Sequence, residues 1–464
     1  MDVWTPAHQL SGHIARRAIS PVELVRSLLD RVERIDGGLH SYLSIDPDDV
    51  LAQARRAEVA LFGDEPLGPL HGLPLSVKDT IDTAGLRTTY GSAVFADHVP
   101  DRDALVVERL RAAGAIIFGK TNTSEFAFHG RTTNRLGSEC VNPWDRTRVA
   151  AGSSGGAAVS VACGLGPLAI GTDGGGSIRY PSAFCGIVGL MPSAGRVPKR
   201  GNVEAGDYGY PLSSIGPMTR DVRDAALLLN AISGHDPRDA TTSRHIWEDA
   251  CIGLDGELAG IRIGWLPAPA GARRDSGVEE AIMQAALSLV EVGAMVEEVS
   301  FVLPDTLAIS AGTNGNAFAM ARRLASDPAT RNLLTPYLIA GVSHPAPGAV
   351  AEAEAWRARQ EVIERLATLF TRFDLIAAPT TCFVAPIRPE DPWQMFADYS
   401  RYIQLPLLAN IAGCPAASVP AGTIDGLPIG LQLMAPRGQD GRVLRAARSL
   451  ERIRPWANIR PSES

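Results

Sequence analysis

Residues 150–181 read AAGSSGGAAVSVACGLGPLAIGTDGGGSIRYP, and they differ in composition from the rest of the chain. Glycine, serine and small apolar residues dominate, and 12 of the 46 glycines fall within residues 152–195. A small-residue helix is predicted over 157–163, and the apolar run 167–170 predicts a strand that leads into three consecutive glycines. Because glycine accepts backbone conformations and close approaches that other residues do not, the stretch indicates tight turns that require backbone freedom.

The segments on either side alternate between helix and strand patterns. Ser20 and Pro21, followed by Glu23, mark a helix start that apolar residues continue to Ile35. This alternation is typical of α/β architecture, and no linker or repeat divides the chain, so one large domain is predicted. Further elements are expected as helices over 103–113, 121–129, 220–232 and 349–372 and as strands at 73–77, 115–118, 261–265, 375–378, 416–419 and 429–434.

Composition excludes several classes of protein. The 464 residues carry 44 Lys and Arg against 51 Asp and Glu, and a net charge of −7 argues against nucleic-acid binding. A hydrophobic fraction of 45% argues against a disordered chain. The six cysteines form neither a zinc pattern nor a disulfide framework. No signal peptide and no membrane-spanning run are visible, so we expect a cytoplasmic protein without a membrane partner.

One motif in the glycine-rich stretch matches a serine-hydrolase pattern. Residues 152–156 have the form GxSxG, in which Ser154 would be the nucleophile of an α/β-hydrolase elbow. That hypothesis needs an acid and then a histidine downstream. The downstream histidines have no suggestive context, and the pattern consists of very common small residues, so the elbow is the weaker interpretation.

A larger pattern explains more of the sequence. The segment 72–79, GLPLSVKD, precedes the glycine-rich stretch; 75 residues separate Lys78 from Ser153, and another 24 lead to Ser177. Together these blocks closely resemble the amidase signature family of Ser–Ser–Lys amide hydrolases. The resemblance covers most of the chain except about 235–370, and it implies a large mixed central β-sheet covered by helices on both faces. Shorter matches lie at 181–186, 195–197, 215–218 and, weakly, 428–432.

The resemblance implies a catalytic role for three residues, and the chemistry of amide cleavage requires their types. Ser177 would be the nucleophile, Lys78 the base and Ser153 the proton relay between them. A free lysine is charged at neutral pH, so Lys78 must be buried to act as a base. Leu75 and Val77 would form the apolar surroundings. The resemblance also implies a cis peptide bond between Gly152 and Ser153.

Further roles follow from the same resemblance. The backbone N–H groups of Gly174, Gly175, Gly176 and Ser177 would form an oxyanion hole for the substrate carbonyl. Ser154, Asp173 and Arg179 would support the loop, the last two as an ion pair. No metal or other cofactor is expected.

Each assignment has a structural alternative. Lys78 alone could be a surface lysine at a strand end, and Ser153 and Ser177 could be N-caps of the helices that follow them. Cys185 could be a nucleophile, although a small buried residue is the simpler interpretation. The sequence also departs from the family pattern at Gly174, Ser213 and Met191.

The identity of the amide is less well indicated. A stand-alone amidase acting on aryl or short-chain amides is the favoured interpretation, with Phe126, Phe128, Tyr180 and Cys414 as substrate-binding candidates. Carbamate hydrolysis by the same triad is one alternative. Another is the glutamine-hydrolysing component of a tRNA-dependent amidotransferase. That component typically has glutamine where this chain has Tyr180.

The expected organisation has four parts within the single domain. They are an N-terminal helical flank (1–65), the signature core (66–232), a variable region lining the substrate side (233–372) and C-terminal strands and helices completing the sheet (373–464). The expected partners are a small amide and water, with a homodimer as a further option.

Overall fold

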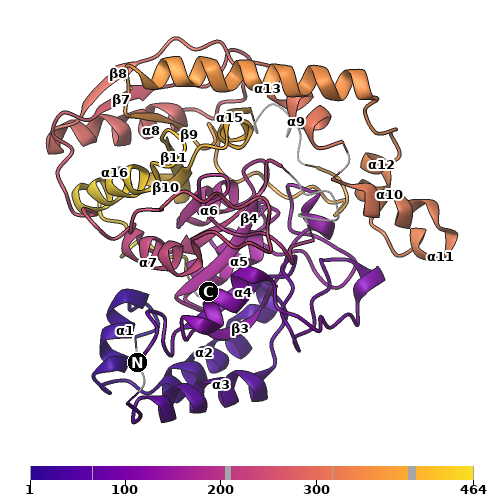
Figure 1. Ribbon diagram of the computed structural model, residues 1–464, viewed down its shortest axis with the longest axis vertical. Helices are drawn as coiled ribbons and strands as arrows, with labels where there is room; N and C mark the ends of the chain where they lie inside the picture. The colour runs from indigo at the N-terminus through magenta and orange to yellow at the C-terminus, as the bar shows by residue number, and fades with distance from the viewer. Residues whose placement is uncertain (1, 65, 204–210, 316, 396–403, 463–464) are drawn as a thin grey trace.

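The fold is built on one mixed β-sheet that runs through the whole molecule. A computed structural model describes residues 2–64, 66–203, 211–315, 317–395 and 404–462. Within these residues the sheet has 11 strands (Figure 1). Their order across the sheet is β1 (Tyr42–Ser44), β3 (Ile116–Thr121), β2 (Pro74–Lys78), β4 (Leu168–Asp173), β6 (Ser214–Thr219), β5 (Val188–Met191), β10 (Ala416–Ile424), β11 (Leu427–Met434), β9 (Leu375–Pro379), β7 (Arg262–Trp265) and β8 (Met295–Glu298).

Parallel and antiparallel strand pairs both occur, as expected for a mixed sheet. Strand β2 is parallel to both of its neighbours, β3 and β4, and β7 is parallel to β8 and β9. The other strand pairs are antiparallel, including the long β10–β11 pair. Parallel neighbours bring the carboxyl ends of their strands to the same edge of the sheet. Lys78 at the end of β2 and Asp173 at the end of β4 therefore lie at one edge.

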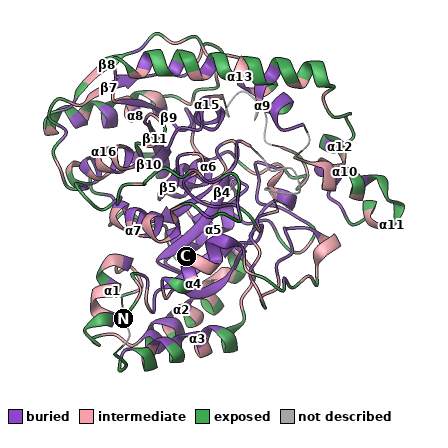
Figure 2. Ribbon diagram, in the orientation of Figure 1, coloured by how far each residue is buried: buried purple, intermediate pink, exposed green. Residues whose placement is uncertain are grey.

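Helices cover both faces of the sheet, which confirms the predicted α/β architecture. Alternate residues of one strand point to opposite faces, and in β9 Leu375 and Ala377 belong to one apolar cluster while Ile376 and Ala378 belong to another. Figure 2 shows the buried sheet between helices whose outer surfaces are exposed. The helices are α1 (Ala7–Ala15), α2 (Pro21–Ile35), α3 (Pro47–Ala60), α4 (Leu105–Ala112), α5 (Gly155–Ala162), α6 (Arg179–Cys185), α7 (Val222–Ile232), α8 (Val278–Leu287), α9 (Thr306–Thr313), α10 (Ala319–Ser326), α11 (Pro328–Arg331), α12 (Pro336–Val342), α13 (Ala349–Phe370), α15 (Gln404–Ala412) and α16 (Asp440–Ile453).

The predicted helix over 121–129 is wrong. Strand β3 continues to Thr121, and only a short 3-10 turn, η3 (Glu125–Ala127), follows it. Phe126 and Ala127 have φ values of 49° and 57°, which an α-helix does not contain. The Ser124 hydroxyl closes this loop, because it donates to the carbonyl of His129 and accepts from the His129 amide. Side-chain bonds of this kind compete with helix formation.

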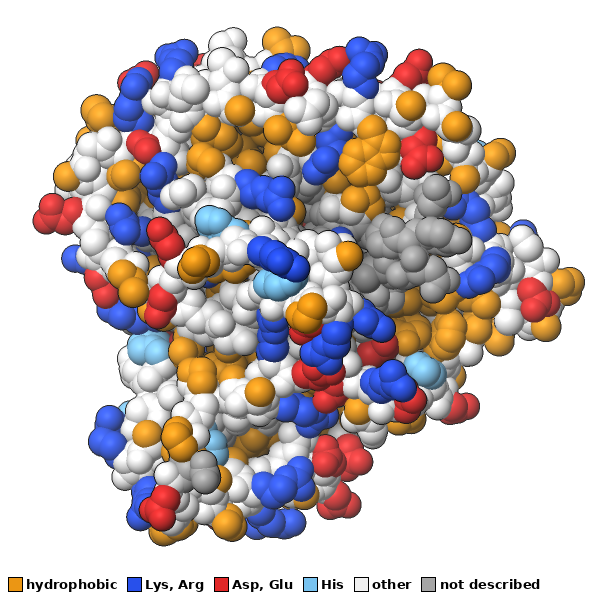
Figure 3. All heavy atoms as spheres, viewed as in Figure 1, with side chains coloured by type: hydrophobic (Ala, Val, Ile, Leu, Met, Phe, Trp, Pro, Cys, Tyr) orange, Lys and Arg blue, Asp and Glu red, His pale blue; other side chains and the backbone are white. Residues whose placement is uncertain are grey.

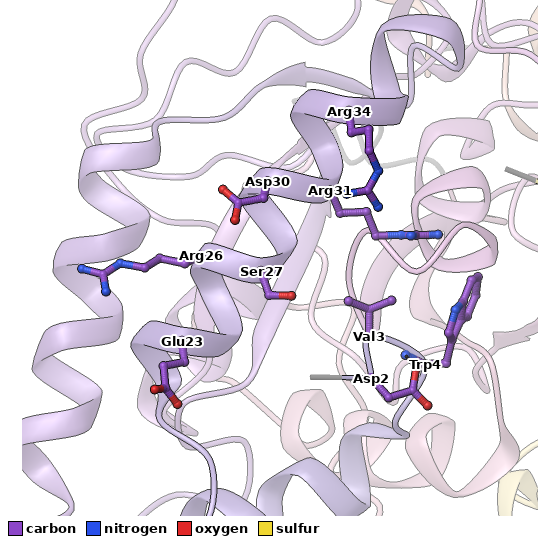
Figure 4. Close-up of a pocket in the computed structure, with 9 residues that line it drawn as sticks. All are labelled: Asp2, Val3, Trp4, Glu23, Arg26, Ser27, Asp30, Arg31 and Arg34. Atoms are coloured by element: carbon purple, nitrogen blue, oxygen red, sulfur yellow. Dashed lines mark hydrogen bonds between the residues drawn. The ribbon is translucent and has the colours of Figure 1, made fainter. Parts of the chain in front are cut away.

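Helix α2 begins as the sequence predicts. The Ser20 hydroxyl accepts hydrogen bonds from the amides of Val22 and Glu23 at 3.0 and 3.2 Å, and Pro21 occupies the first helical position. Between α2 and the N-terminal segment lies a pocket with a volume of about 520 Å³ (Figure 4). None of the residues predicted for catalysis lines this pocket. Its lining consists of Asp2, Val3, Trp4, Glu23, Arg26, Ser27, Asp30, Arg31 and Arg34.

A small helical lobe projects from one side of the molecule (Figure 1). It comprises α10, α11 and α12. Its apolar residues pack against Tyr90 and Phe126, which lie in the loops that follow β2 and β3. Glu125, in the loop after β3, binds this lobe: the buried Glu125 carboxylate accepts hydrogen bonds from the amide and hydroxyl of Thr335. The lobe therefore contacts the loop that replaces the predicted helix.

The visible surface carries mixed charges. Figure 3 shows Lys and Arg side chains interspersed with Asp and Glu over this face, without a large area of one sign. In the described parts of the chain, none of the helices is both long and apolar enough to cross a lipid bilayer.

Candidate active site

Lys78 is a completely buried lysine at the carboxyl end of β2. Its Nζ donates to the Ser153 hydroxyl at 2.6 Å and to the hydroxyl of Thr172. Leu75 and Val77 on the same strand are also fully buried. Successive side chains of a strand point to opposite faces, so these two residues do not form the expected apolar surroundings on the side of Lys78. The structural alternative of a surface lysine is therefore excluded, because the amine lies inside the protein in contact with the predicted relay serine.

Ser153 lies in a turn whose backbone geometry matches the expectation. The Gly152–Ser153 peptide bond is cis. A Cβ atom at residue 152 would lie 3.0 Å from the carbonyl oxygen of His129 and 2.9 Å from the carbonyl carbon of Arg131. Glycine is therefore required at position 152, because neighbouring backbone occupies the space of a side chain.

Ser177 is the least buried of the three residues predicted for catalysis. It follows β4 and three glycines, precedes α6, and is partly exposed, whereas Lys78 and Ser153 are fully buried. Its carbonyl accepts a hydrogen bond from the Ser154 amide at 3.2 Å, which joins the two serine-containing turns. Lys78 and Ser153 are thus equally inaccessible and only Ser177 is partly exposed, which suits an accessible nucleophile with a buried base and relay.

The N-cap alternative for the two serines does not hold. Helix α5 has Ser154 at its N-cap position, and α6 has Ile178, so neither Ser153 nor Ser177 occupies such a position. The elbow hypothesis for Ser154 fails too. Its hydroxyl donates to the Thr172 carbonyl at 3.1 Å and accepts from the Thr172 amide at 3.3 Å, so it ties α5 to β4.

The glycine loop differs from the expectation at one residue. The Gly176 amide donates to the Asp173 carboxylate at 2.7 Å, so in this arrangement it is not directed at a substrate. The amides of Gly174, Gly175 and Ser177 make no hydrogen bond to any described residue. These three remain the candidates for an oxyanion hole. Gly176 instead shapes the loop, with a φ of 111° that favours glycine.

Asp173 and Arg179 form the predicted ion pair beneath the loop. Both are fully buried, and the guanidinium makes two bonds of 2.9 Å to the carboxylate. Burial opposes the charge of Asp173, but Arg179 and further hydrogen bonds outweigh it and lower the pKa of this carboxyl group to about 2. The carboxylate therefore remains charged and can hold the amides of Gly176 and Ile178.

The structure adds three residues to which the sequence assigned no role. Thr172 contacts Lys78 directly. Asn410, on α15, donates to both the carbonyl and the carboxylate of Asp173 at 3.0 Å and accepts from Arg179 at 2.6 Å. Gln432 on β11 accepts from Arg179 at 2.7 Å. Thr172 and Gln432 lie within matched segments, whereas no local pattern marks Asn410, because its partners Asp173 and Arg179 lie more than 200 residues away in sequence.

A second buried lysine lies on the neighbouring strand. Lys120 is paired in register with Val77, and its amine donates to the Ile81 carbonyl and to the Thr83 hydroxyl. Burial lowers the pKa of Lys120 to about 8, against the opposing effect of the Asp79 carboxylate. Lys78 therefore differs from Lys120 in its contacts: Lys78 bonds to Ser153, whereas the acceptors of Lys120 are neither Ser153 nor Ser177.

The four substrate-binding candidates lie in different places. Phe128 packs edge-to-face on Phe318 of the helical lobe at 4.8 Å, and Phe126 packs on Phe95. Tyr180 lies over Gly176, where its ring would collide with any added side chain. Cys414 is buried in an apolar cluster, and burial raises the pKa of its thiol to about 12. Of the four, Tyr180 lies against the candidate oxyanion loop.

Among the described residues, one group has spacing suited to a metal ion. It consists of His8, Asp221 and Asp224 and lies where α1 meets α7. Asp224 accepts hydrogen bonds from the amides of Ala7 and His8 and from the His8 ring, and Asp221 caps α7. These carboxylates are thus already used to join two helix ends. None of them belongs to the Lys78–Ser153 site.

Comparisons with known proteins agree with this geometry. A family model described as Amidase matches residues 23–444. The A subunit of glutamyl-tRNA(Gln) amidotransferase from Moorella thermoacetica is 36% identical, covering 98% of each chain. A bacterial aryl acylamidase structure has a TM-score of 0.87 at 31% identity and covers 98% of this chain and 97% of its own. The peptide amidase of Stenotrophomonas maltophilia has a TM-score of 0.82 at 29% identity, with 97% and 96% covered. The chain therefore belongs to the amidase family, whose members hydrolyse amide C–N bonds.

Proposed function

We propose that the protein hydrolyses aryl or short-chain carboxamides through an acyl-enzyme on Ser177, with Ser153 as relay and Lys78 as base. The observation that carries the proposal is the 2.6 Å hydrogen bond between the buried Lys78 amine and Ser153, next to a turn that bonds to Ser177. Amide hydrolysis needs a nucleophile, a base that later becomes an acid, and donors for the oxyanion. The residues that we assign to these roles come from the end of β2, the turn before α5 and the loop after β4.

The proposed reaction follows from the positions of these groups. The Ser177 hydroxyl attacks the substrate carbonyl carbon, and its proton passes through Ser153 to the neutral Lys78 amine. The amides of Gly174, Gly175 and Ser177 stabilise the oxyanion. When the C–N bond breaks, the proton returns along the same path to the leaving amine. Water then attacks the acyl group in the same way, releases the carboxylic acid and restores Ser177.

A stand-alone amidase is the favoured form of this function. The similarity to an aryl acylamidase over nearly the whole of both chains supports it. Tyr180, at the position where the amidotransferase component typically has glutamine, packs its aromatic ring against Gly176 of the candidate oxyanion loop. Carbamates contain the same carbonyl–nitrogen bond and would react by the same steps.

A second candidate is glutamine hydrolysis within an amidotransferase. The similarity to glutamyl-tRNA(Gln) amidotransferases, 36% over nearly the full length, favours it. The two functions predict different substrates, because an amidotransferase component would release ammonia from glutamine, whereas an aryl acylamidase would release an arylamine from an anilide.

The experiment measures ammonia and amine release from primary amides, anilides, carbamates and glutamine. We expect turnover of anilides or short primary amides, together with labelling by a fluorophosphonate that Ser177→Ala abolishes. Glutamine turnover without anilide turnover would support the second candidate. Near-wild-type turnover by Ser177→Ala on every substrate would overturn the acyl-enzyme mechanism.

A further inference from the structure

His129 is a buried histidine with one ring nitrogen unsatisfied. It lies in the loop after η3, and its side chain is almost inaccessible, since the residue is 5% exposed. Its Nδ1 accepts a hydrogen bond from the Arg131 amide at 3.2 Å, so the ring proton is on Nε2. This Nε2–H is buried and has no partner within the described residues. A buried donor without an acceptor is costly and uncommon in folded proteins.

The ring is held firmly in this orientation. It stacks on Tyr337 of α12 with centroids 4.2 Å apart and an interplanar angle of 23°. The Tyr337 hydroxyl accepts from the Glu125 amide at 2.8 Å and donates to the Thr133 carbonyl at 3.1 Å. Since both the stacking partner and Nδ1 are fixed, the donor on the opposite edge of the ring is preorganised.

The loop that carries this ring supports the reactive turn. The backbone of residues 129–131 occupies the space that a side chain at Gly152 would need, directly before Ser153. A ligand atom bonded to His129 would therefore be bound by the same loop that holds the relay serine in place. The loop that carries the unsatisfied His129 donor therefore also packs against the turn that contains Ser153.

The donor is uncharged under ordinary conditions. Burial and the nearby Arg131 lower the pKa of His129 to about 4, so the imidazole is neutral at neutral pH. The Arg131 guanidinium is itself engaged, because it binds Glu139 through two bonds and the carbonyls of Asp391 and Gln394. A neutral N–H donor compensates the desolvation of a carbonyl oxygen better than that of a carboxylate.

From this geometry we propose that His129 is a specificity-determining residue whose Nε2–H binds an uncharged acceptor oxygen of the substrate, other than the oxygen of the scissile carbonyl. The inference rests on the amide hydrolase function proposed above and deepens it. Amides that carry such an oxygen satisfy the buried donor, whereas amides with a methylene at that place leave it unpaired.

Two matched substrate pairs test the proposal and locate the oxygen. Acetoacetanilide has a carbonyl in its acyl part where butyranilide has a methylene. In the same way, 4′-acetylacetanilide has a carbonyl in its leaving group where 4′-ethylacetanilide has a methylene. We expect the wild-type kcat/KM to favour the oxygen-bearing member of one pair by about tenfold, the effect of one neutral hydrogen bond with a buried partner. The pair that shows the preference identifies the side of the substrate that His129 contacts.

Three variants connect the preference to the ring. His129→Phe keeps an aromatic ring for stacking on Tyr337 but removes Nε2–H, and should abolish the preference while butyranilide turnover continues. His129→Gln places an amide N–H near the Nε2 position and should retain part of the preference. His344→Phe makes the same substitution at an exposed histidine and should change neither rate.

The outcomes separate the two proposals. If wild-type enzyme cleaves none of the four anilides, the aryl form of the proposed function fails, and the role of His129 in selecting such substrates fails with it. If it cleaves both members of each pair equally well, only the role of His129 fails, and this holds even if His129→Phe does not fold. A preference that survives in a folded, active His129→Phe variant would also overturn the role of His129, since an ordered water or another donor would then satisfy the oxygen.

Discussion

The Nζ atom of Lys78 lies 2.6 Å from the Oγ atom of Ser153, although the two residues are 75 positions apart. The lysine ends a buried interior strand, and the serine follows a cis peptide bond in the turn before α5. Their contact gives the amine a hydroxyl partner inside the protein, where burial disfavours the ammonium form. This relationship is the basis of the proposed mechanism.

Replacing Lys78 should remove general-base catalysis. We expect Lys78→Ala to lower kcat/KM for an anilide by about 10²- to 10⁴-fold, the usual contribution of such a base. The wild-type rate should rise with pH through one ionisation that the residual activity of the variant lacks. Lys78→Arg should be equally impaired, because a guanidinium keeps its proton. A wild-type-like rate in either variant would exclude this role for Lys78.

The two adjacent glycines of the candidate oxyanion loop should respond differently to alanine. At Gly176 the φ is 111°, and a Cβ would lie 2.2 Å from the Tyr180 ring. Gly176→Ala should therefore destabilise the protein by at least the ~1–3 kcal/mol typical of backbone strain. At Gly175 a Cβ would meet only Leu407, at 3.4 Å, so Gly175→Ala should leave the unfolding free energy nearly unchanged. Denaturant unfolding of both variants provides the comparison, and equal losses would contradict it.

Breaking the buried ion pair should be costly. Arg179→Met leaves the Asp173 carboxylate without its guanidinium, and the loss of one partner in a buried pair typically costs about 3–5 kcal/mol. Adding Asp173→Asn removes the uncompensated charge, so the double variant should recover part of that loss. Urea unfolding measures the three free energies. A double variant that is less stable than Arg179→Met alone would show that the uncompensated Asp173 charge is not the main cause of the lost stability.

Glu451 should make stability depend on pH. Burial, and then the nearby Asp221 charge, raise the pKa of Glu451 to about 7, well above its value in an unfolded chain. Between about pH 4.3 and 7 the folded state therefore holds a proton that the unfolded state has lost, so this group's contribution to stability falls as pH rises.

Glu451→Gln removes that titration while keeping an acceptor for the Val222 amide. The Tm of the variant and of the wild type is measured at pH 5 and at pH 8. We expect the difference, variant minus wild type, to be larger at pH 8 than at pH 5. Glu364→Gln, on an exposed part of α13, serves as the control and should show no such trend. A difference between variant and wild type that does not change with pH would refute the assignment.

Local sequence determined much of this protein. The alternation of apolar runs predicted the α/β sheet, because strand periodicity is a short-range property. The glycine-rich stretch and its spacing from Lys78 resemble the amidase signature family, and that resemblance implied the roles of the two serines. The same reasoning failed for residues 121–129, where the bonds of Ser124 to His129 and positive φ values at Phe126 and Ala127 override helix-like apolar spacing.

Only the tertiary structure decided which groups meet. It placed Asn410 and Gln432 on the Asp173–Arg179 pair and directed the Gly176 amide to Asp173. It also left the Nε2–H of His129 unpaired among the described residues, in a loop whose backbone packs against Gly152. These outcomes depend on contacts between segments that the sheet order brings together across the chain. No local pattern encodes such contacts, because they arise from the packing of whole strands and helices.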